Sequence, residues 1–234
     1  LGCDFIATGH YANINENDGR YFISKGKDLN KDQSYALWGI SQKNLSRTIF
    51  PLGNLEKDEI KKIALDRGYD NLVKKSESYE ICFVPDNDYR SFLKKRVSNI
   101  DKVIKKGDFI TEDGQTVGTH QGYPFYTIGQ RKGLGLALGY PIYVTNIDIE
   151  KNTVTIGTFD ELKRNGMYVD KLNFMKYDKI DGRLNVYTKI RYNDSGNPSV
   201  IEKVGDTMKV YFGAGVNAIT PGQAAVFYED NDVI

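Results

Sequence analysis

The chain has 234 residues, with 32 Lys and Arg against 31 Asp and Glu, so its charges nearly cancel. It is long enough for one to three domains, and any polyanion partner must be held by local basic patches because no global field attracts it. No apolar run approaches the ~18 residues that span a membrane, and the N-terminus lacks a basic flank with an apolar core, so we expect a cytoplasmic protein. Two cysteines and two histidines argue against a disulfide scaffold and against a structural zinc site.

The first third of the chain has the pattern of an α/β domain. The apolar run 4–7 predicts a buried strand, and it begins so close to Leu1 that we expect more of the same domain upstream. The sequence Asn-Asp-Gly at 17–19 is a hairpin signal. Helices are expected over 32–41, with Asp32 as the N-cap, and over 56–67.

The rest of the chain changes from helix to strand. Asp86 can cap a helix that runs to about Val97. From Gly107 onward, short runs such as 143–149 and 184–192 alternate with glycine-containing turns, which predicts a small barrel or sandwich. The expected fold class is therefore α/β plus β, in three modules: residues 1–85, 86–164 and 165–234.

Cys82, in the stretch Ser76–Pro85, is a candidate reactive sulfur. The thiolate is the nucleophilic form, and Glu77 and Glu80 would raise the pKa of Cys82 unless a nearby lysine or a bound partner offsets them. From these residues alone a structural cysteine is favoured, and a catalytic one remains open. Cys3 lies in the first strand run and is expected to be a small buried residue.

The turn Gly129–Gly135 (Gly-Gln-Arg-Lys-Gly-Leu-Gly) places two adjacent cations between glycines. Its glycines allow close backbone approach, and its cations could contact a phosphate or an acidic protein. It has neither the spacing nor the following helix of a Walker loop or a dinucleotide fingerprint. A plain β-turn and a binding loop both remain open.

Two short groups are candidates for contacts with nucleic acid. Lys31, Asp32 and Gln33 place a cation, an acid and an amide at a predicted helix start, although capping alone would explain Asp32. Arg191 and Tyr192 set a guanidinium beside a ring, which suits a phosphate and a stacked base. A solvent-exposed strand end explains this second pair equally well.

Five stretches occur together in one order along the chain: ATGHYA (7–12), NKDQSYALWGI (30–40), SESYEICFV (76–84), YTIGQRKGLGLALGYPIYV (126–144) and ITPGQAAVFY (219–228). Together they closely resemble the bacterial tRNA-specific 2-thiouridylases, which are tRNA-uridine 2-sulfurtransferases that thiolate the wobble uridine of certain tRNAs. The resemblance spans essentially the whole chain. Its Gln-Arg-Lys-Gly-Leu-Gly and Ile-Cys-Phe elements are specific to that family.

The resemblance implies the C-terminal part of a PP-loop ATP-pyrophosphatase domain over 1–85, a small central domain over 86–164, and a tRNA-contacting β-barrel over 165–234. It implies that Mg-ATP adenylates the C2 oxygen of the uridine in the anticodon arm. A cysteine persulfide, supplied by a cysteine desulfurase or a sulfur-relay protein, would then deliver sulfur. The family's pyrophosphate loop, most of its ATP and Mg²⁺ contacts and its first catalytic cysteine would lie upstream of Leu1, so we expect these 234 residues alone to be inactive in thiolation.

The resemblance also implies roles at matching positions. Cys82 matches the persulfide-carrying cysteine, and Gly9 matches an ATP-contacting glycine. Two other functions remain as alternatives, namely an RNA-binding module without catalysis and another PP-loop ligase that acts on a small molecule. The positions that match tRNA contacts in the family are His10, Lys31, Asp32, Gln33, Arg191, Tyr192 and Gln223.

Overall fold

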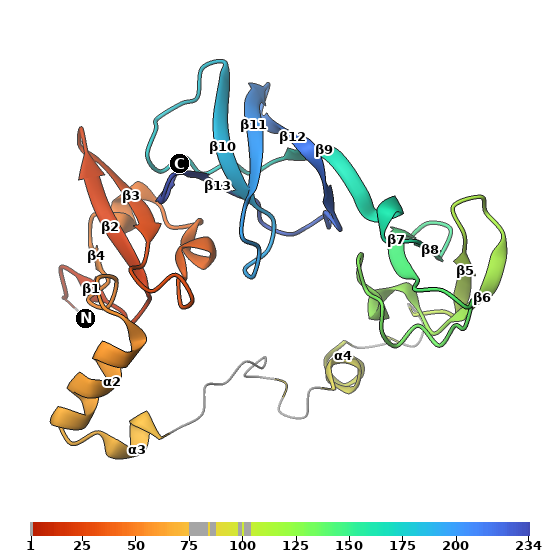
Figure 1. Cartoon of the computed structure of the whole chain (residues 1–234), viewed down its shortest axis with the longest axis horizontal. Helices are drawn as coiled ribbons and strands as arrows, with labels where there is room; N and C mark the ends of the chain where they lie inside the picture. Colours follow the sequence, from red (N-terminus) through yellow and green to blue (C-terminus); the bar gives the residue numbers. More distant parts are fainter. Residues whose placement is uncertain (1, 75–83, 85–87, 98–99, 101–103) are drawn as a thin grey trace. The chain divides into compact units, whose positions relative to one another are not determined.

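The computed structural model describes residues 2–74, 84, 88–97, 100 and 104–234 (Figure 1). The chain divides into two compact units. The first unit comprises Leu1–Lys75, Asn165–Ala214 and Gly222–Ile234, and the second comprises Ser76–Arg164 and Gly215–Pro221. The beginning and the end of the chain therefore fold together in the first unit.

The first unit is built around one sheet with the order β2-β3-β14-β13-β10-β11-β12-β9. A hairpin from the start of the chain thus extends the sheet of the C-terminal segment. A separate small sheet pairs β1 with β4 in parallel. The elements of the two sheets and the helices between them are β1 (Ile6–Ala7), β2 (Ala12–Asn17), β3 (Arg20–Lys25), η1 (Ser34–Leu37), α1 (Gln42–Leu45), β4 (Thr48–Ile49), α2 (Lys57–Asp66), α3 (Asp70–Val73), β9 (Lys163–Val169), β10 (Arg183–Lys189), β11 (Asn197–Val204), β12 (Thr207–Asn217), β13 (Val226–Glu229) and β14 (Asp232–Val233).

The predicted hairpin is confirmed, and its turn shows why it forms. Asn17 pairs with Arg20 across a two-residue turn. In that turn Asp18 and Gly19 have φ values of 50° and 76°, the positive values that a type I′ turn requires and that Gly and Asp accept readily. The turn therefore sets the register of the β2–β3 pair.

Arg20 links this hairpin to the C-terminal segment by hydrogen bonds and an ion pair. Its guanidinium donates to the carbonyl oxygens of Phe174 at 2.9 Å and Met175 at 3.2 Å. It also lies 3.0 Å from a carboxylate oxygen of Asp178. The hydrophobic core beneath draws on both ends of the chain: Ala12, Phe22, Ile23, Leu37, Leu45, Met175, Val226, Tyr228 and Val233.

A half-buried ionic cluster adds to this junction. Lys176 Nζ lies 2.6 Å from a carboxylate oxygen of Glu229 and 2.8 Å from one of Asp232. The hydroxyls of Tyr177 and Ser24 donate to Glu229 and Asp232 at 2.8 and 2.5 Å. Burial lowers the pKa of Lys176, but the two carboxylates outweigh burial and hold it above its usual value. The cluster ties β3 to β13 and β14.

The second unit contains a sheet with the order β6-β5-β8-β7, in which β5 and β8 run parallel and the other neighbours antiparallel. The predicted change from helix to strand after Gly107 is therefore confirmed. The elements of this unit are α4 (Tyr89–Arg96), β5 (Gly107–Ile110), β6 (Thr116–His120), η2 (Tyr123–Phe125), β7 (Tyr143–Asp148), β8 (Thr153–Gly157) and η3 (Asp160–Leu162).

His120 is fully buried beside the core of the second unit, with its ring against Phe109 and Tyr126. The backbone N–H of Gly122 donates to His120 Nδ1 at 3.0 Å, and Nε2 lies 3.2 Å from the carbonyl oxygen of Asn152. Because Nδ1 accepts, the single ring proton of the neutral form lies on Nε2. Burial lowers the pKa of His120, so the neutral ring is favoured.

The prediction of a buried N-terminal strand is wrong for these residues. The strand is shortened to β1, and Phe5 and Ile6 are 60% and 59% exposed. Cys3 is exposed and precedes the strand. Strand β1 pairs with β4 along one edge. The described part of the chain packs no other element on the faces of β1, so the side chains of this strand stay exposed.

The predicted helix over 32–41 is also wrong. A short 3₁₀ turn, η1, occupies Ser34–Leu37, and a separate helix, α1, follows at Gln42–Leu45. Short polar side chains compete with helical hydrogen bonding by bonding to nearby backbone groups. Asp32 does so here, because its carboxylate binds the N–H groups of the preceding loop and of Ser34.

The two longer predicted helices are confirmed, with one change of cap. Helix α2 begins with a capping box in which Glu56 and Glu59 bond reciprocally to each other's backbone N–H. Helix α4 begins at Asp88, whose carboxylate accepts from Ser91 N at 3.0 Å. The predicted cap, Asp86, lies outside the described residues.

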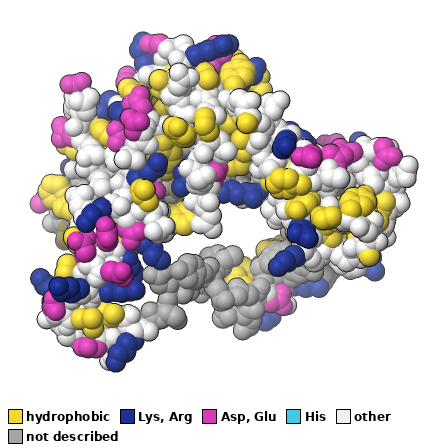
Figure 2. Space-filling model, viewed as in Figure 1, with side chains coloured by type: hydrophobic (Ala, Val, Ile, Leu, Met, Phe, Trp, Pro, Cys, Tyr) yellow, Lys and Arg dark blue, Asp and Glu magenta, His cyan; other side chains and the backbone are white. Residues whose placement is uncertain are grey.

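The surface agrees with the nearly balanced charge. Figure 2 shows Lys and Arg interspersed with Asp and Glu over the visible face. In the described ranges, no helix is both long and apolar enough to cross a membrane. Those same ranges contain no group of three or more His, Cys, Asp and Glu that could hold a metal ion, so we derive no step through Mg²⁺.

Candidate nucleic-acid interface

The turn Lys31–Gln33 links β3 to η1, and its acid points into the fold. Asp32 is only 9% exposed. Its Oδ1 accepts hydrogen bonds from the backbone N–H groups of Gly26 and Ser34, both at 3.1 Å, and its Oδ2 accepts from Ser34 Oγ at 2.8 Å. Three donors satisfy the buried carboxylate. Asp32 therefore shapes the turn, and its half-buried neighbours Lys31 and Gln33 reach the surface.

Gln33 joins this turn to the segment that contains His10. Its backbone N–H donates to Tyr11 O at 2.9 Å, and its side-chain Oε1 accepts from Tyr11 N at 3.0 Å. Gly26 passes so close that a Cβ there would lie 2.9 Å from Tyr11 O. Among the described residues Gln33 Nε2 has no hydrogen-bond partner, so this amide remains able to donate to a base or a phosphate.

Tyr35 connects the same turn to two C-terminal segments. Its hydroxyl donates to Ala224 O at 2.8 Å, directly after Gln223. Its ring meets the ring of Tyr192 edge to face, with centroids 6.4 Å apart. Burial raises the pKa of Tyr35, Asp194 raises it further, and Arg191 opposes the rise. Tyr35 therefore contacts both C-terminal segments, the one that contains Tyr192 and the one that contains Gln223.

Tyr192 lies close enough to the Lys31–Gln33 turn for the charges of that turn to act on its hydroxyl. Burial raises the pKa of Tyr192, the charge of Asp32 adds to the rise, and Lys31 opposes it. Tyr192 is nevertheless 45% exposed. A partly exposed ring beside a lysine and an arginine can stack on a base while the cations meet phosphate oxygens.

His10 and Gly9 follow β1 on a loop that leads into Tyr11. His10 Nδ1 lies 2.8 Å from Thr8 Oγ1, and its ring packs edge to face on Phe50 with centroids 5.8 Å apart. Gly9 is exposed, and a Cβ there would be in ordinary contact with Leu52. The loop after a parallel strand is a common ligand site in α/β domains, but sterics alone do not require glycine at this position.

A chain of buried hydrogen bonds holds the Asp32 carboxylate in place. Ser34 Oγ lies 3.0 Å from the hydroxyl of Tyr228 on β13, and both residues are fully buried. Since Ser34 donates its only hydroxyl proton to Asp32, Tyr228 donates to Ser34. Burial raises the pKa of Tyr228 well above its usual value, which keeps this donor protonated.

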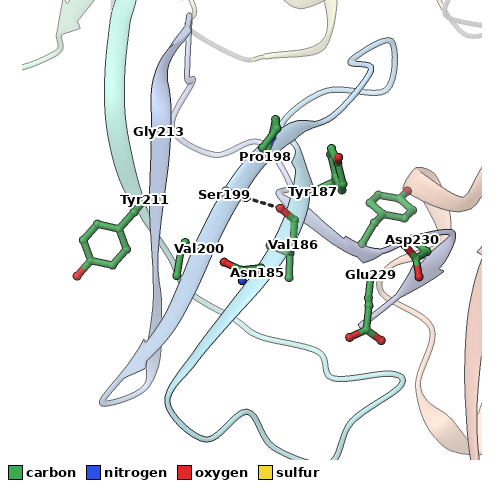
Figure 3. Close-up of a pocket in the computed structure, with 11 residues that line it drawn as sticks. Asn185, Val186, Tyr187, Pro198, Ser199, Val200, Tyr211, Gly213, Glu229 and Asp230 are labelled. Atoms are coloured by element: carbon green, nitrogen blue, oxygen red, sulfur yellow. Dashed lines mark hydrogen bonds between the residues drawn. The ribbon is translucent and has the colours of Figure 1, made fainter.

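A cavity of about 450 Å³ opens on the sheet of the C-terminal segment, between strands β10, β11, β12 and β13 (Figure 3). Its lining includes Tyr187, Tyr211 and Glu229. Inside the sheet, Ser199 Oγ donates to Val186 O at 3.3 Å, the bond drawn in Figure 3. No predicted site residue lines this cavity, but Tyr228, which bonds to Ser34 under the candidate interface, does.

The structure therefore brings most of the predicted contact residues together in the first unit. Gln33 is linked to the His10 segment through Tyr11, and Tyr35 links that turn to Tyr192 and to the residue after Gln223. Sequence reasoning missed Tyr35, although it lies two positions after Gln33 in a stretch already singled out. Cys82 lies outside the described residues.

Three family models match the chain in order. A tRNA methyl transferase HUP domain matches residues 1–86, a tRNA methyl transferase PRC-barrel domain matches 90–158, and an aminomethyltransferase beta-barrel domain matches 164–234. The expected α/β plus β fold class, with a PP-loop-type domain, a small central domain and a C-terminal barrel, is confirmed by these matches.

Alignments with curated relatives cover the whole chain. A tRNA-specific 2-thiouridylase MnmA of Amoebophilus asiaticus is 65% identical, one of Cytophaga hutchinsonii is 60% identical, and one of Salinibacter ruber is 52% identical. Each alignment covers 100% of this chain and 62%, 64% and 62% of the respective relative. Sequence identity at this level over the whole chain is more specific evidence for the family than the descriptions of the domain models, which mention methyl transfer. The chain belongs to the tRNA-specific 2-thiouridylase family.

Proposed function

We propose that this chain takes part in ATP-dependent 2-thiolation of the wobble uridine of tRNA, as a tRNA-uridine 2-sulfurtransferase in the cytoplasm. The observation that supports it most is the meeting of Lys31–Gln33, Arg191–Tyr192 and the Gln223 segment at Tyr35. These groups offer cations, an amide donor and a partly exposed ring. That set suits a phosphate backbone with an unstacked base.

The proposed chemistry uses a persulfide on Cys82. ATP would adenylate the C2 oxygen of the uridine and release pyrophosphate, because a carbonyl oxygen leaves poorly until it bears a phosphate. The terminal sulfur of the persulfide then bonds to C2, and AMP leaves with the oxygen. A second thiol then attacks the Cys82 sulfur and forms a disulfide with it, which breaks the S–S bond to the transferred sulfur and leaves that sulfur on C2. His10, with Lys31, Gln33, Arg191, Tyr192 and Gln223, would hold the anticodon arm, and Gly9 would lie against ATP.

The three modules proposed for this work are residues 1–85, 86–164 and 165–234, and the order of the three family matches supports them. The chain spans less than two thirds of the length of its relatives. The glycine- and serine-rich pyrophosphate loop that the reaction needs does not occur in these 234 residues. We therefore expect no thiolation when the chain is given ATP, a sulfur donor and tRNA; robust turnover would contradict this expectation.

The direct test measures tRNA binding and persulfide formation on the same chain. Filter binding should detect a complex with a tRNA that has uridine at position 34 (the wobble position), with an affinity that falls as salt rises. After incubation with a persulfide donor, mass spectrometry should find the added sulfur on the Cys82 peptide. Cys82→Ser should remove that sulfur and leave tRNA affinity nearly unchanged.

The outcomes separate the alternatives. Binding of tRNA without sulfur on Cys82 would favour an RNA-binding module, and absence of tRNA binding would favour a ligase for a small molecule. In either case sulfur transfer by this chain would be rejected.

A further inference from the structure

The Gly129–Gly135 turn of the second unit is anchored at both ends. Gly129 N donates to Val144 O at 2.8 Å, and Val144 N donates to Gln130 O at 3.0 Å, so the turn begins as a partner of β7. At the other end Leu134 is 7% exposed and packs in the core of the second unit. Arg131, Lys132 and Gly133 lie between these anchors and form the short, closed tip of the turn.

The side chain of Gln130 crosses the tip and holds its shape. Its Oε1 accepts from Thr127 N at 3.1 Å, and its Nε2 donates to Lys132 O at 2.9 Å. Gly133 follows with φ of 74°, a left-handed conformation that a residue with a Cβ rarely adopts. Because the tip is already fixed in one conformation, a ligand would lose little free energy in ordering it.

The tip presents two cations for which the described residues supply no counter-ion. The side chains of Arg131 and Lys132 are exposed, and within the described ranges neither has an ion pair or a side-chain hydrogen bond. Lys151 of the same unit differs, because its Nζ lies 3.6 Å from a carboxylate oxygen of Asp148. In a chain whose charges nearly cancel, two adjacent unpaired cations on a rigid tip form a local anion site.

We propose that the Gly129–Gly135 turn binds a phosphodiester of the RNA substrate, with Arg131 and Lys132 as the contacts and Gln130 as their positioning residue. The proposal rests on the proposed function, since it takes that RNA to be tRNA. A guanidinium matches two phosphate oxygens at once, and an ammonium adds a compact charge beside it. An acidic protein fits less well, because the tip offers no exposed aromatic or aliphatic anchor of the kind found at the centre of protein interfaces.

The experiment compares two matched double substitutions by their salt dependence. A labelled tRNA with uridine at position 34 (the wobble position) is titrated with the 234-residue chain, with R131Q/K132Q and with K151Q/K163Q, from about 50 to 200 mM salt. Lys163 is the second control cation, since its Nζ lies 3.0 Å from a carboxylate oxygen of Asp160. Equal thermal midpoints of the two variants establish that both are folded.

For R131Q/K132Q we expect affinity at the lowest salt to fall on the order of tenfold and the salt slope to decrease by about 1–2. For K151Q/K163Q we expect affinity within about twofold of the unmodified chain. Gln130→Ala keeps both cations, so it should weaken binding about threefold by loosening the tip while its salt slope stays unchanged. Unchanged affinity of Gln130→Ala would overturn the positioning role.

Two further results would overturn the phosphate contact. If the unmodified chain binds tRNA and R131Q/K132Q has the same slope as K151Q/K163Q, the contact is rejected and the proposed function stands. If R131Q/K132Q keeps tRNA affinity but loses binding to polyglutamate, the turn serves an acidic protein instead. Failure of the unmodified chain to bind tRNA at any salt would overturn the proposed function together with this contact.

Discussion

The hydroxyl of Tyr228 lies 3.0 Å from Ser34 Oγ, and this bond joins the last strands of the first unit to the turn that contains Asp32. It continues through Ser34 to the Asp32 carboxylate, which also holds the backbone N–H of Gly26. The candidate RNA contacts on either side of Asp32 are thus positioned by a residue near the other end of the chain. Stability and RNA affinity should respond separately to changes at this junction.

Asp32→Ala should destabilise the first unit by about 2–4 kcal/mol. It leaves the buried N–H groups of Gly26 and Ser34 and the Ser34 hydroxyl without an acceptor, and each orphaned donor costs about 1–3 kcal/mol. Chemical denaturation with far-UV circular dichroism measures the change. Asp32→Asn is the control, since its amide oxygen can still accept from both N–H groups. Equal stability of the alanine variant and the unmodified chain would contradict the assigned role.

Tyr35→Phe should weaken tRNA binding by about 2- to 10-fold with little loss of stability. The ring still meets Tyr192, but the hydrogen bond to Ala224 O, worth about 0.5–1.5 kcal/mol, is lost and Gln223 becomes less well placed. Filter binding measures the affinity. Tyr69→Phe removes the hydroxyl of an exposed tyrosine elsewhere in the same unit. Equal affinity of the two variants would show that Tyr35 does not position the contact.

Lys176→Met should destabilise the first unit by about 1–3 kcal/mol. The substitution leaves the half-buried carboxylates of Glu229 and Asp232 without their cation. Lys179→Met tests the same chemical change in solvent, because Lys179 and Asp181 are 70% and 76% exposed, and it should cost less than about 1 kcal/mol. Urea unfolding of both variants gives the comparison. A larger loss for Lys179→Met would refute the importance of the cluster.

His120 should make the second unit less stable in mild acid. Its pKa in the folded protein is lowered from 6.5 by burial, so the unfolded chain takes up a proton more readily than the folded one. The stability that the neutral ring contributes is therefore complete above pH 6.5 and is lost as pH falls below that value. Denaturation midpoints measured from about pH 7.5 to 5.5 should decline. His120→Asn should flatten this decline even if it lowers stability throughout; an unchanged decline would assign it to other groups.

Local chemistry was sufficient to predict several elements. The Asp-Gly pair at 18–19 determines the hairpin because a type I′ turn needs positive φ at both positions. The acidic first turn of α2 predicts that helix, and in the structure a capping box closes its start. The pattern of five stretches predicts the family, and the curated relatives confirm it.

Tertiary structure decided the roles within the interface. From sequence, Asp32 is a helix cap or an RNA contact, but in the fold its carboxylate is satisfied by Gly26 and Ser34. No local pattern could bring Tyr35 to Tyr192 and Ala224, because these residues come from opposite ends of the chain and meet only when the N-terminal hairpin joins the C-terminal sheet. Which side chains are buried, and which remain available to bind RNA, depends on that long-range pairing.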